Sequence, residues 1–196
     1  REHDLIGLFP GSREREVARL FPVMVETAGR LHLHNPDWKF EAAAASDVLA
    51  DQMRTIILEA KLPVSFINVQ TGSSYSLMQR ATSGVVASGT ATLEAAALGL
   101  PYCLVYKISW PTWLIGKLLV KLKFIGLVNI LAGEEVVKEL IQGAAVPDNI
   151  ARNIKLLMED KAYRENLQGR LLSTAARLGE RGAHKRAASE VLDVLR

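Results

Sequence analysis

The chain has 196 residues, 49% of them apolar, and carries a formal net charge of +3. That size suits one domain, or a large half of a two-domain enzyme, with a sizeable buried core. The single cysteine, Cys103, excludes an internal disulfide, and the modest charge does not choose among a nucleotide, a membrane and a nucleic acid as anionic partner.

The chain begins with Arg1 rather than Met, so we expect a fragment, a processed chain or a cloned domain. No secretory signal opens the sequence, and the lone cysteine fits a reducing compartment. No uninterrupted apolar run reaches the roughly 20 residues that a membrane-spanning helix needs.

Short apolar segments alternate with longer segments of helical periodicity. Strands are predicted at residues 4–9, 38–44, 64–69, 83–88 and 101–106. Helices are predicted at residues 13–34, with an interruption at Pro22, and at 47–60, 73–81 and 90–99. The chain after Glu134 predicts helix throughout, broken near residues 143–147.

This alternation predicts an α/β fold, a Rossmann-like parallel sheet with helices on both faces. The segments GVVAS and YCLVY are continuously apolar, as fully buried parallel strands are. We expect the sheet domain to occupy residues 1–146 and a helical C-terminal tail, residues 147–196, to pack on it or on a partner. Ligands bind at the carboxyl ends of such strands, which here means the loops after Phe9, Val69, Ser88 and Tyr106.

The first of these loops, FPGSRERE, offers groups that suit a phosphate. Gly11 helps to form a turn, Ser12 is placed to cap the next helix, and Arg13 adds a fixed positive charge near the helix N-terminus. An ordinary turn and cap with solvated charges would look the same. The glycine spacing matches neither a Walker loop nor the dinucleotide fingerprint.

A second loop, ASGTATLEAA, also follows a buried strand and opens a helix. Ser88, Gly89 and Thr90 lie between the strand and the helix; Gly89 lets a ligand approach the backbone closely, and Thr90 can cap the helix. Glu94 lies one turn further on the same helix face, where its carboxylate could accept hydrogen bonds from ribose hydroxyls. The alternative is a capped helix with a surface glutamate.

The stretch from Ala95 to Gly133 contains no acidic residue but several lysines and two tryptophans. It predicts either a membrane-surface contact or a partly buried helix with snorkelling lysines. The residues concerned are Trp110, Trp113, Lys117 and Lys121. Further on, polar side chains in apolar surroundings could line a sugar pocket or merely cap and solvate helices. They are Asn129, Lys138, Glu139 and Gln142.

Metal and nucleic-acid sites are not expected. His32 and His34 form an H-x-H pair, but no cysteine or carboxylate cluster accompanies it, and no Asp-x-Asp pair is present. The basic residues near the C-terminus alternate with Glu and Ala and lack an aromatic platform for bases.

Three segments resemble the carboxyl-terminal half of lipid-A-disaccharide synthases. FPGSREREV is similar to that family's L-P-G-S-R-x-x-E opening, and ASGTATLEAA to its S-G-T-A-x-L-E segment. NILAGEEVVKELIQ is similar to N-x-L-A-G-x-x-x-x-x-E-x-x-Q, the most specific of the three. The spacing between them also agrees, and the resemblance covers essentially the whole chain.

The resemblance implies the donor-binding Rossmann-like half of a GT-B glycosyltransferase. The implied reaction is an inverting transfer from UDP-2,3-diacylglucosamine to 2,3-diacylglucosamine 1-phosphate (lipid X). Its products are the lipid A disaccharide 1-phosphate and UDP, in the lipopolysaccharide biosynthesis of Gram-negative bacteria. The implied donor-binding residues are Gly11, Ser12, Arg13, Ser88, Gly89, Thr90, Glu94, Asn129, Glu139 and Gln142, the last three lying around the sugar or shaping its loop. Glu16 also matches, as a structural partner of the first loop.

The resemblance also implies a peripheral enzyme at the cytoplasmic face of the inner membrane, with no cofactor and with homodimerisation through the C-terminal part as an option. The acceptor site and the catalytic base belong to the amino-terminal half, so we expect the isolated chain to bind UDP and to be inactive. The alternatives are another UDP-N-acetylglucosamine transferase or epimerase of the same fold, or a non-catalytic nucleotide-binding or dimerisation module.

Overall fold

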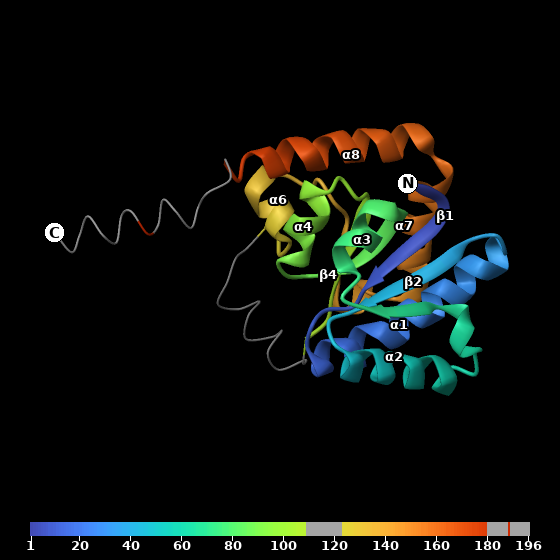
Figure 1. Ribbon diagram of the computed structural model, residues 1–196. Coiled ribbons are helices and arrows are strands. Elements are labelled where there is room, and N and C mark those ends of the chain that lie inside the picture. The colour runs from blue at the N-terminus through green and yellow to red at the C-terminus, as the bar shows by residue number, and fades with distance from the viewer. Residues whose placement is uncertain (109–122, 180–187, 189–196) are drawn as a thin grey trace.

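A computed structural model of the chain describes residues 1–108, 123–179 and 188 and contains one six-stranded parallel sheet (Figure 1). The strand order is β3-β2-β1-β4-β5-β6, so the first strand lies in the interior of the sheet. This is the doubly wound arrangement expected from the alternation in the sequence. The strands are β1 (Glu2–Phe9), β2 (Lys39–Ala44), β3 (Asn68–Thr71), β4 (Ala81–Ala87), β5 (Tyr102–Tyr106) and β6 (Glu139–Ile141).

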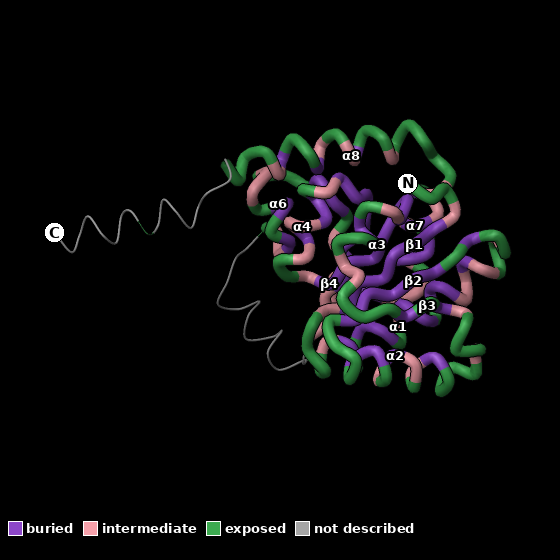
Figure 2. The backbone as a smooth tube through the Cα atoms, viewed as in Figure 1, coloured by how far each residue is buried: buried purple, intermediate pink, exposed green. Residues whose placement is uncertain are grey.

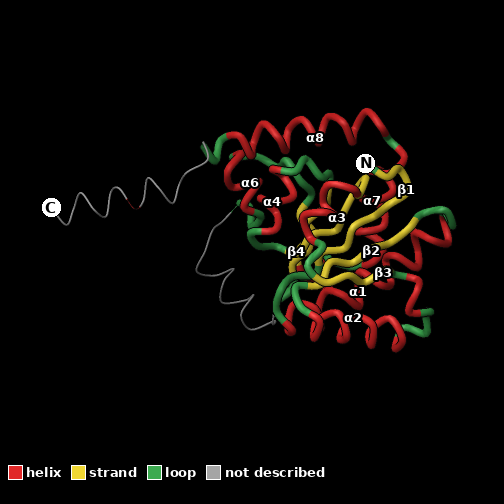
Figure 3. Tube along the Cα trace, viewed as in Figure 1, coloured by secondary structure: helices red, strands yellow, loops and turns green. Residues whose placement is uncertain are grey.

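Helices cover both faces of the sheet, which confirms the predicted fold class (Figures 1 and 3). One group packs together around α1 (Glu14–His34), with α2 (Asp47–Glu59) on one side of it and α7 (Pro147–Glu159) on the other. The other face carries α3 (Ser74–Arg80) and α4 (Ala91–Ala97), with α6 (Leu127–Ala132) beside α4. Two short 3-10 turns, η1 (Val64–Phe66) and η2 (Gln142–Ala144), lie in the connections between α2 and β3 and between β6 and α7.

The core lies between the sheet and these two layers (Figure 2). Every residue of β4 is buried, and all but the last residue of β5 are buried too. Burial on both faces explains the apolar runs GVVA in β4 and YCLVY in β5. Cys103 of β5 belongs to this core, and burial raises the pKa of its thiol to about 12.

The predicted break at Pro22 is wrong, because α1 runs through this proline. A proline removes one N–H and frees the carbonyl four residues earlier, here that of Ala18. Both residues lie on the exposed face of α1, where water can satisfy that carbonyl. The opposite face of the helix packs into the core through residues such as Val17, Phe21 and Met24.

Two other sequence predictions need correction. The predicted strand at residues 64–69 begins as the turn η1, and β3 starts only at Asn68. The uniform helix predicted after Glu134 contains a sixth strand, β6, whose Leu140 pairs with Val105 of β5. Only three residues long, β6 is too short to show a strand period in the sequence, and it owes its form to pairing with β5.

Beyond β6, α7 and α8 (Lys161–Ala176) pack on the sheet domain, α7 against β4 and β5 and α8 across α4 and α6 (Figure 1). Within the described part of the chain, no helix is long and apolar enough to cross a bilayer. The residues predicted to contact a membrane, Trp110, Trp113, Lys117 and Lys121, lie outside the described residues.

Candidate functional site

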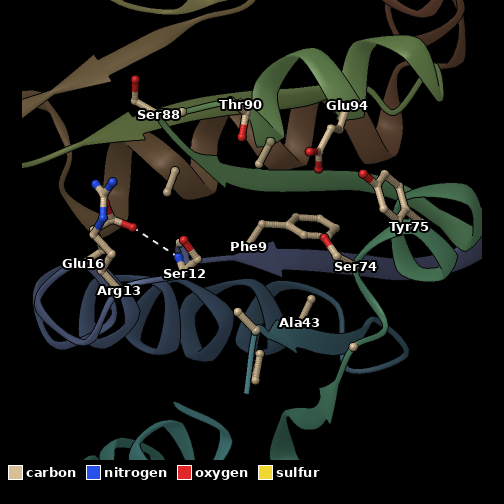
Figure 4. Close-up of a pocket in the computed structure, with 17 residues that line it drawn as sticks. Phe9, Ser12, Arg13, Glu16, Ala43, Ser74, Tyr75, Ser88, Thr90 and Glu94 are labelled. Atoms are coloured by element: carbon tan, nitrogen blue, oxygen red, sulfur yellow. Dashed lines mark hydrogen bonds and ion pairs between the residues drawn. The ribbon is translucent and has the colours of Figure 1, made fainter. Parts of the chain in front are cut away.

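A pocket of about 590 Å³ opens at the carboxyl ends of β1, β2, β3 and β4 (Figure 4). This is the edge of the sheet at which ligands bind in folds of this class. The residues predicted from the sequence in the first two loops all line this one pocket, although Arg13 and Ser88 are 75 positions apart in the chain. Those residues are Gly11, Ser12, Arg13, Ser88, Gly89, Thr90 and Glu94.

The first loop differs in detail from its prediction. Helix α1 begins at Glu14 with Arg13 as its N-cap residue, and the Ser12 side chain makes no cap, so that prediction is wrong. The carboxylate of Glu16 reaches back instead. It accepts the Ser12 N–H at 3.1 Å and pairs with the Arg13 guanidinium at 3.1 Å. In a capping box the glutamate at the third helical position bonds to the N–H of the N-cap residue, whereas Glu16 bonds to the N–H of Ser12, one residue before the N-cap Arg13.

Gly11 makes this arrangement possible. Its φ of +108° lies in a region that L side chains rarely adopt. A Cβ atom placed on it would lie 2.3 Å from Glu16 Oε2, which is far inside van der Waals contact. Glycine at this position therefore leaves room for the Glu16 carboxylate in the pocket.

In the second loop, the main-chain N–H of Ser88 bonds to Val105 O at 3.0 Å, which continues the pairing of β4 with β5. Gly89 has a φ of +153°, and a Cβ atom there would meet only open space. Thr90 is the N-cap residue of α4, but its backbone is already helical and its side chain makes no cap. Thr92 Oγ1 instead donates to Gly89 O at 2.6 Å, so the predicted cap by Thr90 is wrong.

The pocket has two chemically different ends (Figure 4). Ser12, Arg13 and Glu16 lie at one end, and Glu94 of α4 lies with Tyr75 at the other. Tyr102 of β5 ties α4 to the sheet, because its buried hydroxyl donates to Thr92 O at 3.1 Å. Burial raises the pKa of this hydroxyl, so it stays protonated and keeps donating.

Sequence reasoning missed Ser74 and Tyr75, which line the pocket from the start of α3. Tyr75 is 60% exposed, so its ring is available to a ligand. A signal existed, since the loop after the third strand was one of those expected to meet a ligand. The sequence places Ser74 and Tyr75 at the start of the helix predicted at residues 73–81, and the structure shows that this helix start faces the pocket.

The segment NILAGEEVVKELIQ, residues 129–142, does not line this pocket. Asn129 is fully buried, and its side-chain amide makes four hydrogen bonds within the protein. Its Oδ1 accepts the N–H groups of Val136 and Val137 at 2.8 and 2.9 Å. Its Nδ2 donates to Val137 O and to Glu139 Oε1, both at 2.9 Å.

Glu139 and Gln142 also bind main chain. The Glu139 carboxylate accepts the N–H groups of Ile125 and Gly126, each at 2.9 Å. The Gln142 amide pairs with both main-chain groups of Ile108, at 3.1 and 3.2 Å, from a left-handed backbone with φ of +51°. These contacts favour the expectation that the motif shapes a loop, while direct contact of Asn129, Glu139 and Gln142 with a donor stays a prediction.

The two histidines of the H-x-H pair have separate neighbours. His34 Nε2 lies 2.5 Å from a carboxylate oxygen of Glu159 on α7, and the His32 ring packs edge-on against Phe66. Across residues 1–108 and 123–179, no group of three or more His, Cys, Asp or Glu side chains is placed to hold a metal ion.

Solved structures with the same fold include UDP-sugar proteins. UDP-GlcNAc 2-epimerase from Neisseria meningitidis, bound to UDP-GlcNAc, superposes with a TM-score of 0.61 at 15% identity, over 97% of this chain and 45% of that one. A mutant of S. aureus TarM in complex with fondaparinux, alpha-GlcNAc-glycerol and UDP gives 0.61 at 11% identity, over 98% and 35%. The fold is therefore that of a Rossmann-like half of the GT-B glycosyltransferases and related epimerases.

Sequence comparison is more specific. The family model described as lipid-A-disaccharide synthetase matches residues 1–191. The lipid-A-disaccharide synthase of Geobacter sulfurreducens is 39% identical over 97% of this chain, and that of Persephonella marina is 37% identical over 99%. The chain belongs to the lipid-A-disaccharide synthetase family, and it spans 49% and 52% of the length of these two relatives.

Proposed function

We propose that this chain is the donor-binding half of an inverting glycosyltransferase. The enzyme would join UDP-2,3-diacylglucosamine to 2,3-diacylglucosamine 1-phosphate and release UDP. One observation carries the proposal. A single pocket at the carboxyl edge of the sheet combines the Arg13 loop, the turn at residues 88–90 and the Glu94 carboxylate.

The two ends of the pocket suggest how UDP lies in it. The diphosphate would lie beside Ser12 and Arg13, where its oxygens could bind the main-chain N–H and the guanidinium that Glu16 now contacts. Glu94 would accept hydrogen bonds from the ribose hydroxyls. The exposed ring of Tyr75, at the same end as Glu94, would lie against the nucleoside.

In this arrangement the chain supplies leaving-group stabilisation. As the glycosidic bond to UDP breaks, negative charge develops on the diphosphate. Arg13 and the main-chain N–H groups of the two loops would stabilise that charge. The attacking hydroxyl of the acceptor must lose a proton, and we assign that base and the acceptor site to the other half of the enzyme.

A second candidate is a transferase or epimerase that uses soluble UDP-N-acetylglucosamine, as some proteins of this fold do. The motif from Asn129 to Gln142 favours the lipid enzyme, because it is the family's most specific segment.

We further propose that Trp110, Trp113, Lys117 and Lys121 contact the cytoplasmic face of the inner membrane, which would bring the pocket to a lipid-linked donor. Homodimerisation remains part of the proposal.

Calorimetric titration of the chain with UDP tests the donor site. Arg13→Ala and Glu94→Ala should each weaken binding by about 1–3 kcal/mol, as expected for a lost hydrogen bond to a charged group. Arg15→Ala is the matched control, because Arg15 lies two residues away on the exposed side of α1 and does not line the pocket. Failure of UDP to bind, both to the chain alone and with the amino-terminal half supplied, would refute the assignment of these loops.

A further inference from the structure

We infer that Glu16 is a built-in counter-ion of the phosphate loop, which the diphosphate of the donor must displace in order to bind. The inference rests on the proposed function, because it concerns the same loop and the same ligand. It makes Glu16 a determinant of donor affinity through competition, in addition to its part in the geometry of the loop.

The Glu16 carboxylate binds two of the groups that the proposed site offers to phosphate, the Ser12 N–H and the Arg13 guanidinium. One oxygen accepts the Ser12 N–H at 3.1 Å, and the other pairs with Arg13 at 3.1 Å (Figure 4). One N–H cannot make a full hydrogen bond to Glu16 and to a phosphate oxygen at once. The carboxylate therefore stands where part of the ligand's charge would lie.

The loop is shaped around this carboxylate. Gly11 takes a backbone conformation with φ of +108°, and a Cβ atom there would lie 2.3 Å from Glu16 Oε2. Glu16 also lines the pocket, so its carboxylate faces the space that a ligand would enter. The same carboxylate gives the Ser12 N–H a hydrogen-bond partner.

The contact is weak enough to exchange. The Arg13 side chain is 82% exposed and that of Glu16 is 32% exposed, and ion pairs in such solvated positions contribute little. A diphosphate brings several oxygens and more negative charge, so it can replace one carboxylate on these donors. Displacing Glu16 nevertheless lowers the net affinity, and its carboxylate then lies close to the bound diphosphate and repels it.

Removing the charge of Glu16 should therefore tighten diphosphate binding selectively. Calorimetry with UDP and with uridine would compare the unmodified chain, Glu16→Gln and the control Glu14→Gln. Glu14 carries the same charge in the same helical turn but does not line the pocket. Glu16→Gln should bind UDP about fivefold more tightly and leave uridine affinity within about twofold, and Glu14→Gln should change both by less than about twofold.

The outcomes separate this inference from the proposed function. Weaker UDP binding by Glu16→Gln would overturn the inference and make Glu16 a residue that positions Arg13, while UDP binding itself would still stand. An equal gain in UDP affinity in Glu14→Gln would overturn the inference, because the gain would then come from the general loss of negative charge near the site. No UDP binding by any form would overturn both, and binding by Glu16→Gln alone would support both. If Glu16→Gln lowers the Tm strongly, Glu16→Asp withdraws the carboxylate from both donors and should also tighten UDP binding.

Discussion

Asn129 shows how one buried side chain can hold a loop through hydrogen bonds within the protein. Its amide uses both oxygen lone pairs and both N–H groups on Val136, Val137 and Glu139. Glu139 in turn holds Ile125 and Gly126. Gln142 binds the main chain of Ile108, just before residues 109–122. Asn129 and Glu139, which bind each other, hold the main chain just after them.

This predicts a large stability cost for Asn129→Ala. The change leaves two buried N–H groups and a carbonyl without their partner, so the free energy of unfolding should fall by about 2–4 kcal/mol. Urea unfolding followed by circular dichroism measures it. The control is Asn149→Ala, which removes a single exposed bond to Ala144 O and should cost about 1 kcal/mol or less. Equal effects of the two changes would contradict this account of Asn129.

Single residues also show where sequence reasoning fails. The sequence correctly predicted that Arg13 and Glu94 belong to one site, because strand ends and turn residues can be identified from a sequence. It could not show that the Glu16 carboxylate would take the Ser12 N–H, since that depends on the φ of Gly11. The cap assigned to Thr90 failed for a similar reason, because capping requires an extended backbone.

At the scale of elements, periodicity identified β1, β2, β4 and β5 and the helix α1. These elements bury one face or both, so their patterns are strong. The same signal missed β6, because tertiary pairing with β5 creates that strand. The sequence prediction also overestimated the power of Pro22 to break the helix. That power depends on whether water can satisfy the carbonyl that the proline frees.

The segment with Trp110 and Trp113 yields an element-scale prediction. If it contacts lipid, replacing Trp110, Trp113 and Lys121 by alanine should lower partitioning to anionic vesicles by more than about tenfold, through lost apolar burial and lost charge. Vesicle co-sedimentation measures this. Lys161→Ala, which removes one exposed charge from α8, should have little effect. Undiminished vesicle binding by the triple variant would show that the segment serves another surface.

At the scale of the whole molecule, the chain covers 49% of its Geobacter relative. Because we assign the acceptor site and the base to the other half, the isolated chain should bind UDP and form no disaccharide. Release of UDP from UDP-2,3-diacylglucosamine in the presence of lipid X tests this, with the full-length enzyme as the positive control. Robust synthase activity from residues 1–196 alone would contradict the division of labour.

The interior position of β1 has a consequence for folding. Ile6 pairs with Phe40 on one side and with Ser83 on the other. The first pairing can form early in synthesis, but the second must wait until β4 has been made. Until then β1 has an unpaired apolar edge, the kind of edge on which chains associate. Nascent or truncated chains that stop before residue 81 should therefore aggregate, and the sheet should assemble slowly from β1 outwards.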